Sequence, residues 1–333
     1  MSSKKGGINM SEFKKIKRNE EGNVCQKHLY ITYDTQCQCD CKCCRNKSFD
    51  NTIMKNNKQK IQKKIIEEAS DFRHIVFGGG EPLLKIDEIA DLIHAINRRN
   101  FQPEYNEEDE IFYSLASNGE RSIFLEKINE NCTICAKFHQ IILSRYHYDD
   151  HKNNLIFKSK TELISSTDLL NLCPSLKKKI QFSCLCQKNG IETIEDVKHY
   201  IGWAAKLGFS NVMFSNFQDE VTVSEAKKLG CDLSFLSDAQ KMIKKDLGFR
   251  KETSILFSAG YKITNYTGVI PFELQKKSNV PMKNVKITIL FREFISEEEL
   301  QKEWINARRK TYNYSIMPNG KMYSDWECKV EKK

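Results

Sequence analysis

Residues 29–44 read Leu-Tyr-Ile-Thr-Tyr-Asp-Thr-Gln-Cys-Gln-Cys-Asp-Cys-Lys-Cys-Cys. The first five residues are mostly β-branched or aromatic, which predicts a strand over 29–33. Five cysteines then follow within residues 37–44. Thiolates this close together in a loop suit an iron–sulfur cluster or zinc, because both are bound by soft sulfur ligands.

One choice of three cysteines gives the spacing Cys-x3-Cys-x2-Cys, namely Cys37, Cys41 and Cys44. The register that begins at Cys39 would need a cysteine at position 46, which is Asn46. Three thiolates on a four-iron cluster leave one iron without a protein ligand, and an open coordination position is where a metal can bind substrate. The alternative is a zinc knuckle whose four ligands are drawn from the five cysteines.

Downstream of the cysteines, short apolar runs alternate with amphipathic stretches. The clearest helical pattern covers 194–206, which opens with a capping Thr193 and closes near Gly208. The alternation predicts a parallel sheet with right-handed crossovers, covered on both faces. The fold class is therefore α/β, and a partial (β/α)6 barrel and an open doubly wound sheet both fit. The predicted strands are 29–33, 74–77, 111–115, 138–143, 180–185 and 211–214.

The pattern changes after about residue 217. We expect a flexible basic lead-in over 1–27, the barrel core over 28–217, and a C-terminal α+β appendage over 218–333 that packs on the barrel as a substrate-side cap. In the appendage the sequence predicts a helical stretch at 222–247, β runs at 254–259, 262–270 and 285–293, a helix at 296–309, and a hairpin around 317–320.

Composition restricts the partners and the location. The chain has 53 basic and 44 acidic residues, and this net charge of +9 is spread widely, so it permits an anionic partner without demanding one. No arginine-rich stripe interleaves with aromatics, which makes nucleic-acid binding a minority interpretation. No window approaches the ~18 apolar residues of a membrane helix, and the N-terminus lacks a secretory apolar segment, so we expect a cytoplasmic protein. Its thirteen cysteines then favour metal ligation over disulfides.

The Cys37-x3-Cys41-x2-Cys44 loop, placed after the first strand of a βα series, resembles the radical S-adenosylmethionine (radical SAM) superfamily. The resemblance implies a barrel of the radical SAM type and one 4Fe–4S cluster on these cysteines. It also implies that SAM chelates the open iron through its amino and carboxylate groups, and that electron transfer releases a 5′-deoxyadenosyl radical that abstracts hydrogen. Family members often carry an aromatic residue just before the third cysteine, where this chain has Cys43.

Further motifs stand where predicted strands end, the face on which βα-barrel chemistry occurs. The second strand runs into Gly78-Gly-Gly-Glu-Pro82, which resembles the GGEP motif that contacts the SAM amino group. Ser117-Asn118-Gly119 is similar to the family's Thr-Asn-Gly, although Asn-Gly is also a common turn. The resemblance implies SAM-binding roles for Gly79, Gly80, Glu81, Ser117 and Asn118, for Ser144 near the ribose, for Arg145 near the carboxylate, and for Phe214 and Ser215 near the adenine.

We expect a single cluster, because only Cys231 and Cys328 lie beyond residue 217. The segment around Pro318-Asn-Gly320 resembles the entry to the auxiliary-cluster domain of peptide-modifying relatives, but the expected cysteine after Tyr323 is missing. The leading hypothesis is a radical SAM enzyme that acts on a peptide or a small molecule such as a nucleotide, with an external electron donor of the flavodoxin or ferredoxin type. The alternative is a non-catalytic zinc or iron–sulfur interaction module.

Overall fold

The computed structural model describes the chain from residue 24 onward, with gaps. The expected lead-in lies outside the described residues up to position 23, and residues 24–27 belong to the first strand. In this part of the chain no helix is both long and apolar enough to cross a membrane. The described residues are 24–44, 46, 51–100, 111–128, 133–216, 228, 230, 234–257, 261–270, 285–307, 309–317 and 320–324.

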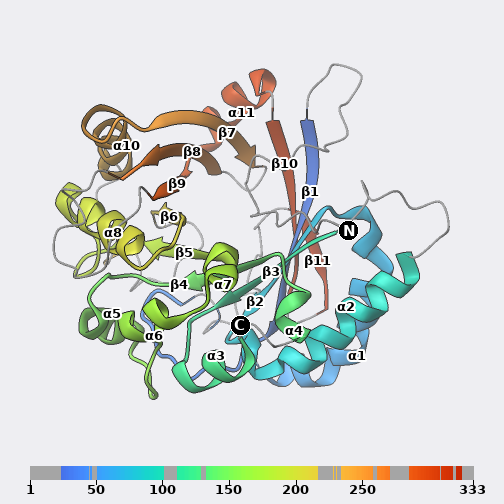
Figure 1. Cartoon of the computed structure of the whole chain (residues 1–333). Helices are drawn as coiled ribbons and strands as arrows, with labels where there is room; N and C mark the ends of the chain where they lie inside the picture. Colours follow the sequence, from blue (N-terminus) through green and yellow to red (C-terminus); the bar gives the residue numbers. More distant parts are fainter. Residues whose placement is uncertain are drawn as a thin grey trace, which may run out of the picture.

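Strands and helices alternate through the first two thirds of the chain, as the sequence predicts. All six predicted strands are present, and the helices lie on the outside of the sheet (Figure 1). The elements are β1 (Val24–Asp34), α1 (Asn51–Glu68), η3 (Ala69–Asp71), β2 (His74–Gly79), η4 (Pro82–Lys85), α2 (Ile86–Asn100), β3 (Phe112–Ser117), α3 (Arg121–Lys127), α4 (Thr133–Ala136), β4 (Gln140–Ser144), α5 (Asp150–Phe157), α6 (Ser166–Asn171), α7 (Pro174–Lys179), β5 (Ile180–Leu185), α8 (Ile194–Lys206) and β6 (Asn211–Ser215).

Helix α8 shows how local sequence fixes an element. Thr193 caps it by accepting a hydrogen bond from the Asp196 N–H, while the Asp196 carboxylate accepts one from the Thr193 N–H. This reciprocal cap satisfies donors that the first helical turn leaves free. Val197 and Ile201 are fully buried one turn apart, so the predicted helix over 194–206 is confirmed.

The C-terminal third adds strands to the same sheet. Its strands β9, β8, β7 and β10 continue from β6, and β10 then pairs with β1. Hydrogen bonding therefore closes a barrel-like ring in the order β1-β2-β3-β4-β5-β6-β9-β8-β7-β10, in which β8 runs opposite to the others. The elements are α10 (Ser234–Asp246), β7 (Arg250–Phe257), β8 (Tyr261–Val269), β9 (Lys286–Phe294), α11 (Glu297–Asn306), β10 (Arg309–Ile316) and β11 (Met322–Ser324).

This architecture differs from the expected partial six-stranded barrel with an appendage. The C-terminal strands do not pack on an open barrel but complete it, and strands from both sides of residue 217 share one sheet. The physical reason is that β1 extends back to Val24, so that its residues from Val24 to Ile31 pair in parallel with all of β10. An open edge at β1 would leave a row of unpaired backbone groups, which the pairing satisfies.

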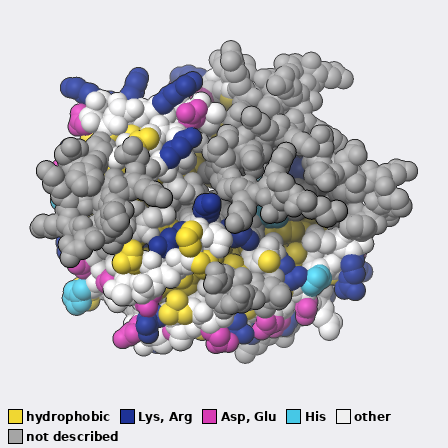
Figure 2. All heavy atoms as spheres, in the orientation of Figure 1, with side chains coloured by type: hydrophobic (Ala, Val, Ile, Leu, Met, Phe, Trp, Pro, Cys, Tyr) yellow, Lys and Arg dark blue, Asp and Glu magenta, His cyan; other side chains and the backbone are white. Residues whose placement is uncertain are grey.

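The two faces of the ring have different contents. Leu29 and Ile31 of β1 belong to the outer core between sheet and helices, whereas His28, Tyr30 and Thr32 line a cavity inside the ring. This alternation is the period-two geometry of a strand. Figure 2 shows lysine and arginine side chains near the centre of one molecular face and acidic side chains mainly along its lower edge.

Candidate functional site

The cysteine loop follows β1 directly and reaches the cavity inside the ring. All five cysteines from Cys37 to Cys44 line this cavity, whose volume is about 460 Å³. The carboxyl ends of the parallel strands meet at this end of the ring, so the loop stands where the sequence placed the chemistry. Cys37, Cys41 and Cys44 therefore border one cavity, and their role as cluster ligands stays a prediction.

Two glycines let the end of β2 hold the cysteine loop by its backbone. The N–H of Gly80 donates to the Asp34 carbonyl at 2.7 Å, and the N–H of Glu81 donates to the Gln36 carbonyl at 2.7 Å. A Cβ on Gly80 would lie 2.1 Å from the Gln36 oxygen, and Gly79 has a φ of +123° that disfavours side chains. The glycines therefore place the loop, and both also line the cavity.

Asn118 touches the cysteines themselves. Its Nδ2 lies 3.4 Å from Cys37 Sγ and 3.3 Å from Cys39 Sγ. Its own N–H donates at 2.7 Å to Glu81, which fixes the start of the turn. Asn118 is therefore a positioning residue for the thiols, a closer role than the SAM contact inferred from the motif.

The thiols lie near enough to perturb one another. A hydrogen bond with Cys39 lowers the pKa of the Cys37 thiol to about 6, and contact with Cys43 raises the pKa of Cys41 to about 12. Among the described residues no three metal-binding side chains converge on a single ion. The fit to a 4Fe–4S cluster therefore rests on thiolate chemistry, on the Cys-x3-Cys-x2-Cys spacing and on the shared cavity.

Glu81 does not face the cavity. It is fully buried, and its two carboxylate oxygens accept hydrogen bonds from the N–H groups of Leu83 and Asn118 at 3.1 and 2.7 Å. Burial raises the pKa of this carboxyl to about 7. Its side chain thus braces the ends of β2 and β3, and a direct contact with SAM is not supported by this geometry.

The three serines that were predicted to contact SAM differ in whether they line the cavity. Ser117 and Ser144 both line the cavity, and Ser117 Oγ also accepts a hydrogen bond from the Gly119 N–H at 3.0 Å. Ser215 is buried and does not line it, since its hydroxyl is directed at the Cys184 carbonyl at 3.5 Å.

Phe214 points away from the cavity as well. Its ring packs against Tyr200 of α8 and Phe291 of β9 at centroid distances of 5.4 and 5.7 Å, in the outer core. Its strand neighbour Met213 lines the cavity instead. The expected adenine contact of Phe214 is therefore corrected: on a strand buried on both faces, the apolar pattern does not show which side chains point inward.

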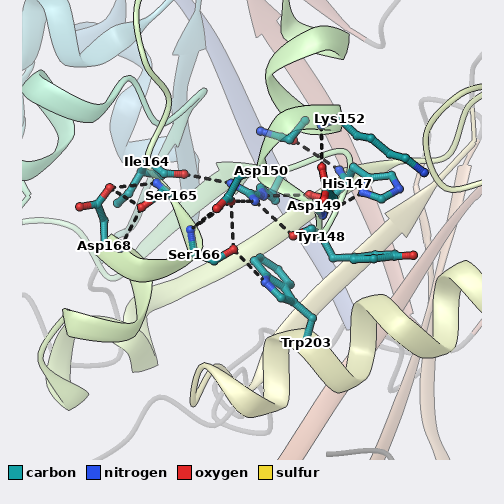
Figure 3. A network of polar contacts seen from close by, with 12 residues as sticks. His147, Tyr148, Asp149, Asp150, Lys152, Ile164, Ser165, Ser166, Asp168 and Trp203 are labelled. Atoms are coloured by element: carbon teal, nitrogen blue, oxygen red, sulfur yellow. Dashed lines mark hydrogen bonds and ion pairs between the residues drawn. The ribbon is translucent and has the colours of Figure 1, made fainter. Parts of the chain in front are cut away.

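Of the predicted site residues, Arg145 differs most from its expected position. Its guanidinium is 1% exposed, outside the cavity lining, and donates to the carbonyls of His147 and Ile164 at 2.8 and 2.9 Å. It also pairs with Asp150 and lies 5.1 Å over the Trp203 ring. Figure 3 shows Asp150 beside Ser166, with Trp203 of α8 below them. The donors of Arg145 are thus occupied by the loop after β4 and by the residues before α6. The expected role of Arg145 at the SAM carboxylate is therefore corrected.

Two further cavity residues, Tyr146 and Asn46, belong to no motif that the sequence analysis assigned to the site. Tyr146 lines the cavity next to the cysteines and stacks on Phe157 at 4.5 Å. Asn46 also lines it and donates a hydrogen bond to the Gly79 carbonyl. Both stand beside predicted site residues, so proximity in the sequence was the only available signal.

Comparison with known proteins agrees with the cysteine loop. Residues 20–162 match a protein family described as a 4Fe-4S single cluster domain. This segment, which contains the cysteine loop and β1 to β4, is therefore similar to a 4Fe–4S domain. No curated protein matches the chain. Of the solved structures, Streptococcus suis SuiB bound to S-adenosylmethionine aligns with a TM-score of 0.51 and 13% identity, over 92% of this chain and 62% of that one.

Two further structures are similar at lower scores. SuiB bound to precursor peptide SuiA aligns with a TM-score of 0.46 and 14% identity, over 68% of this chain and 47% of that chain. The protein anSMEcpe with bound AdoMet and Cp18Cys peptide aligns with a TM-score of 0.46 and 19% identity, over 66% of this chain and 61% of that chain. The alignment with SuiB over 92% of this chain confirms the predicted α/β fold class, and the family match over residues 20–162 agrees with the predicted 4Fe–4S cluster.

Inside the ring, polar side chains join strand to strand. His74 Nε2 lies 2.7 Å from Ser114 Oγ, which donates to Gln140 Oε1 at 3.2 Å. Gln140 Nε2 donates to Gln181 Oε1 at 2.9 Å, and Gln181 Nε2 approaches Met213 Sδ at 3.9 Å. This series, which we call the polar belt, crosses β2 to β6 and satisfies its own hydrogen bonds.

Proposed function

We propose that the chain is a radical SAM enzyme. Cys37, Cys41 and Cys44 would hold one 4Fe–4S cluster, and SAM would bind at the iron that they leave open. When bound, these groups supply a 5′-deoxyadenosyl radical that abstracts hydrogen from a substrate. The observation that carries the proposal is that all three cysteines line one cavity at the carboxyl end of the strands.

The chain's own residues would place and shield this chemistry. Gly79 and Gly80 hold the loop against β2, and Asn118 donates toward Cys37, which supports the thiolate. Gly79, Gly80, Ser117 and Ser144 line the cavity and are the candidates for contact with SAM. The closed ring surrounds the cavity with strands, which limits access of water to a reactive species.

A peptide or a small molecule such as a nucleotide would be the substrate, with residues beyond 217 on its side of the cavity. Two of the similar structures hold peptides, which favours the peptide. The chain spans 47%, 62% and 61% of the three solved chains it resembles, so substrate and partners stay proposals. A flavodoxin or ferredoxin in the cytoplasm would supply the electron.

The test is anaerobic reconstitution followed by reduction with dithionite in the presence of SAM. We expect about four irons per chain and release of 5′-deoxyadenosine. Alanine at Cys37, Cys41 or Cys44 should abolish that release, whereas Cys39→Ala should retain it. Wild-type protein with an intact, reducible cluster and no 5′-deoxyadenosine would overturn the proposal.

One observation favours the zinc alternative. The Cys37 and Cys39 thiols contact each other, so Cys39 could serve as a fourth ligand. That site would yield a colourless protein with one zinc per chain, and Cys39→Ala would lose the metal.

A further inference from the structure

Arg292 is a cation on the inner face of the ring and belongs to β9, whereas the cysteine loop follows β1. It lies near the end of β9, paired with Ser215 of β6 and Ile263 of β8, and it lines the cavity. Its guanidinium carbon is 5.6 Å from the ring centres of both Tyr261 and Phe294. Two aromatic neighbours hold the plane of the guanidinium and keep its donor fork ordered.

The charge of Arg292 has no counterpart among the described residues. None of the described side chains forms an ion pair with it, and its buried Nε has no acceptor there. Among the described residues that line the cavity there is no Asp or Glu, and the other Lys or Arg among them, Lys27, lies 3.8 Å from Asp71. A buried donor without an acceptor is destabilising. An anionic ligand that accepts a hydrogen bond from this donor would therefore gain binding free energy.

Asn265 offers the complementary group. Its side chain also lines the cavity, and its buried Oδ1 has no donor among the described residues. Asn265 pairs with Leu290, two residues before Arg292 on the neighbouring strand, so the two side chains are diagonal neighbours on one face of the sheet. A charged donor fork and a free acceptor oxygen therefore stand side by side.

We propose that this pair binds the substrate of the proposed enzyme by a carboxylate on Arg292 and a nearby N–H on Asn265, the groups that an acidic peptide segment presents. The inference rests on the proposed function. It assigns Arg292 to substrate because β10, β7 and β8 separate β9 from the strand that carries the cysteine loop, where SAM would place its own carboxylate. Arg145 is no competitor, since its donors are engaged elsewhere.

The test compares two probe peptides on reconstituted full-length protein with SAM present, by anaerobic calorimetry. The probes are N-acetyl-Ala-Glu-Ala-amide and the neutral isostere N-acetyl-Ala-Gln-Ala-amide. We expect the glutamate peptide to bind about 10- to 100-fold more tightly, as for a charge-assisted bidentate contact. Arg292→Met should remove the preference and Arg292→Lys should reduce it. The matched control Arg250→Met, at an exposed arginine of β7, should keep it.

Other outcomes overturn the inference. These are failure of wild-type protein to prefer the glutamate peptide, a preference that survives Arg292→Met, or loss of SAM affinity in Arg292→Met, which would assign the cation to SAM. Asn265→Leu should weaken both peptides several-fold without changing their ratio, and an unchanged affinity for both would remove Asn265 from the site. A peptide preference in a protein that releases no 5′-deoxyadenosine would leave the anion site standing and refute only the proposed catalysis.

Discussion

The inner face of the ring differs between β2–β6 and the β8–β9 pair. Along β2–β6 the polar belt passes hydrogen bonds from His74 to Met213 in an unbroken series. On β8 and β9, Arg292 Nε and Asn265 Oδ1 are buried without a partner among the described residues. Both regions line the same cavity.

This difference distinguishes a wall that stabilises the fold from a wall that is suited to bind a ligand. Polar groups that satisfy one another stiffen a wall, whereas buried groups without a partner carry a cost that a ligand can offset. The cysteine loop belongs to the first type, because glycine backbones and Asn118 fix it before any ligand arrives. We therefore expect substitutions near β1–β4 to alter stability and metal content, and those on β8–β9 to alter affinity.

Gly80→Ala should give the largest effect. The new Cβ would meet the backbone oxygen of Gln36 at 2.1 Å, which a small movement cannot relieve. We expect most of the bound iron to be lost, measured as iron per chain after reconstitution. The control Gly248→Ala has open space around a φ of +66° and should cost about 1 kcal/mol with full iron content. Normal iron in Gly80→Ala would contradict the role of this contact.

Gln140→Leu would break the polar belt in the middle. It removes the hydrogen bonds to Ser114 and Gln181 and leaves a buried oxygen of Gln181 without its donor. The unfolding free energy, measured with urea, should fall by about 2–3 kcal/mol. Gln301→Leu, at an exposed glutamine of α11, should change it by less than about 0.5 kcal/mol. Equal effects of the two variants would mean that the belt adds no stability.

Acid should destabilise the ring through its buried histidines. Burial lowers the pKa of His28 to about 4 from 6.5, and burial also lowers the pKa of His74. Because the unfolded chain takes up these protons first, the stability is complete above pH 6.5 and is lost as pH falls toward 4. His28 alone should cost about 2 kcal/mol between pH 7 and pH 5. Urea unfolding of His28→Gln should lose that part of the pH dependence; an unchanged dependence would refute it.

Asn118→Asp should have the smallest effect of the four. The variant keeps the shape of the side chain but replaces the amide N–H group 3.4 Å from Cys37 Sγ with a negatively charged carboxylate oxygen. We expect about tenfold slower formation of 5′-deoxyadenosine at unchanged iron content, as for other partners of metal ligands. A rate equal to that of wild-type protein would show that the contact does not tune the site.

The sequence was sufficient for the strands and for the cysteine loop. Apolar runs bounded by glycines and polar turns locate β1–β6, and counting the spacing selects Cys37, Cys41 and Cys44. The closing of the ring was not predictable, since it joins β1 to β10; Thr32 and Met317, for example, are in contact across 285 residues. Register between segments so distant has no local signal.

The direction of side chains was the second feature that the sequence could not predict. A motif places Arg145 at the end of a strand but cannot show that the Ile164 and His147 carbonyls take up its donors. Arg292 belongs to a strand whose neighbours are set only by the closed ring, so no motif marks it. The sequence therefore locates the cysteine loop of the cavity better than the β8–β9 wall.

The most direct test of the open iron is electron paramagnetic resonance of the reduced, reconstituted protein with and without SAM. Three cysteine ligands leave one iron free, so SAM should change the spectrum of the cluster in wild-type protein and in Cys39→Ala alike. A spectrum that SAM leaves unchanged, in a sample with a full cluster, would contradict the assignment of Cys37, Cys41 and Cys44 as its three ligands around a SAM site.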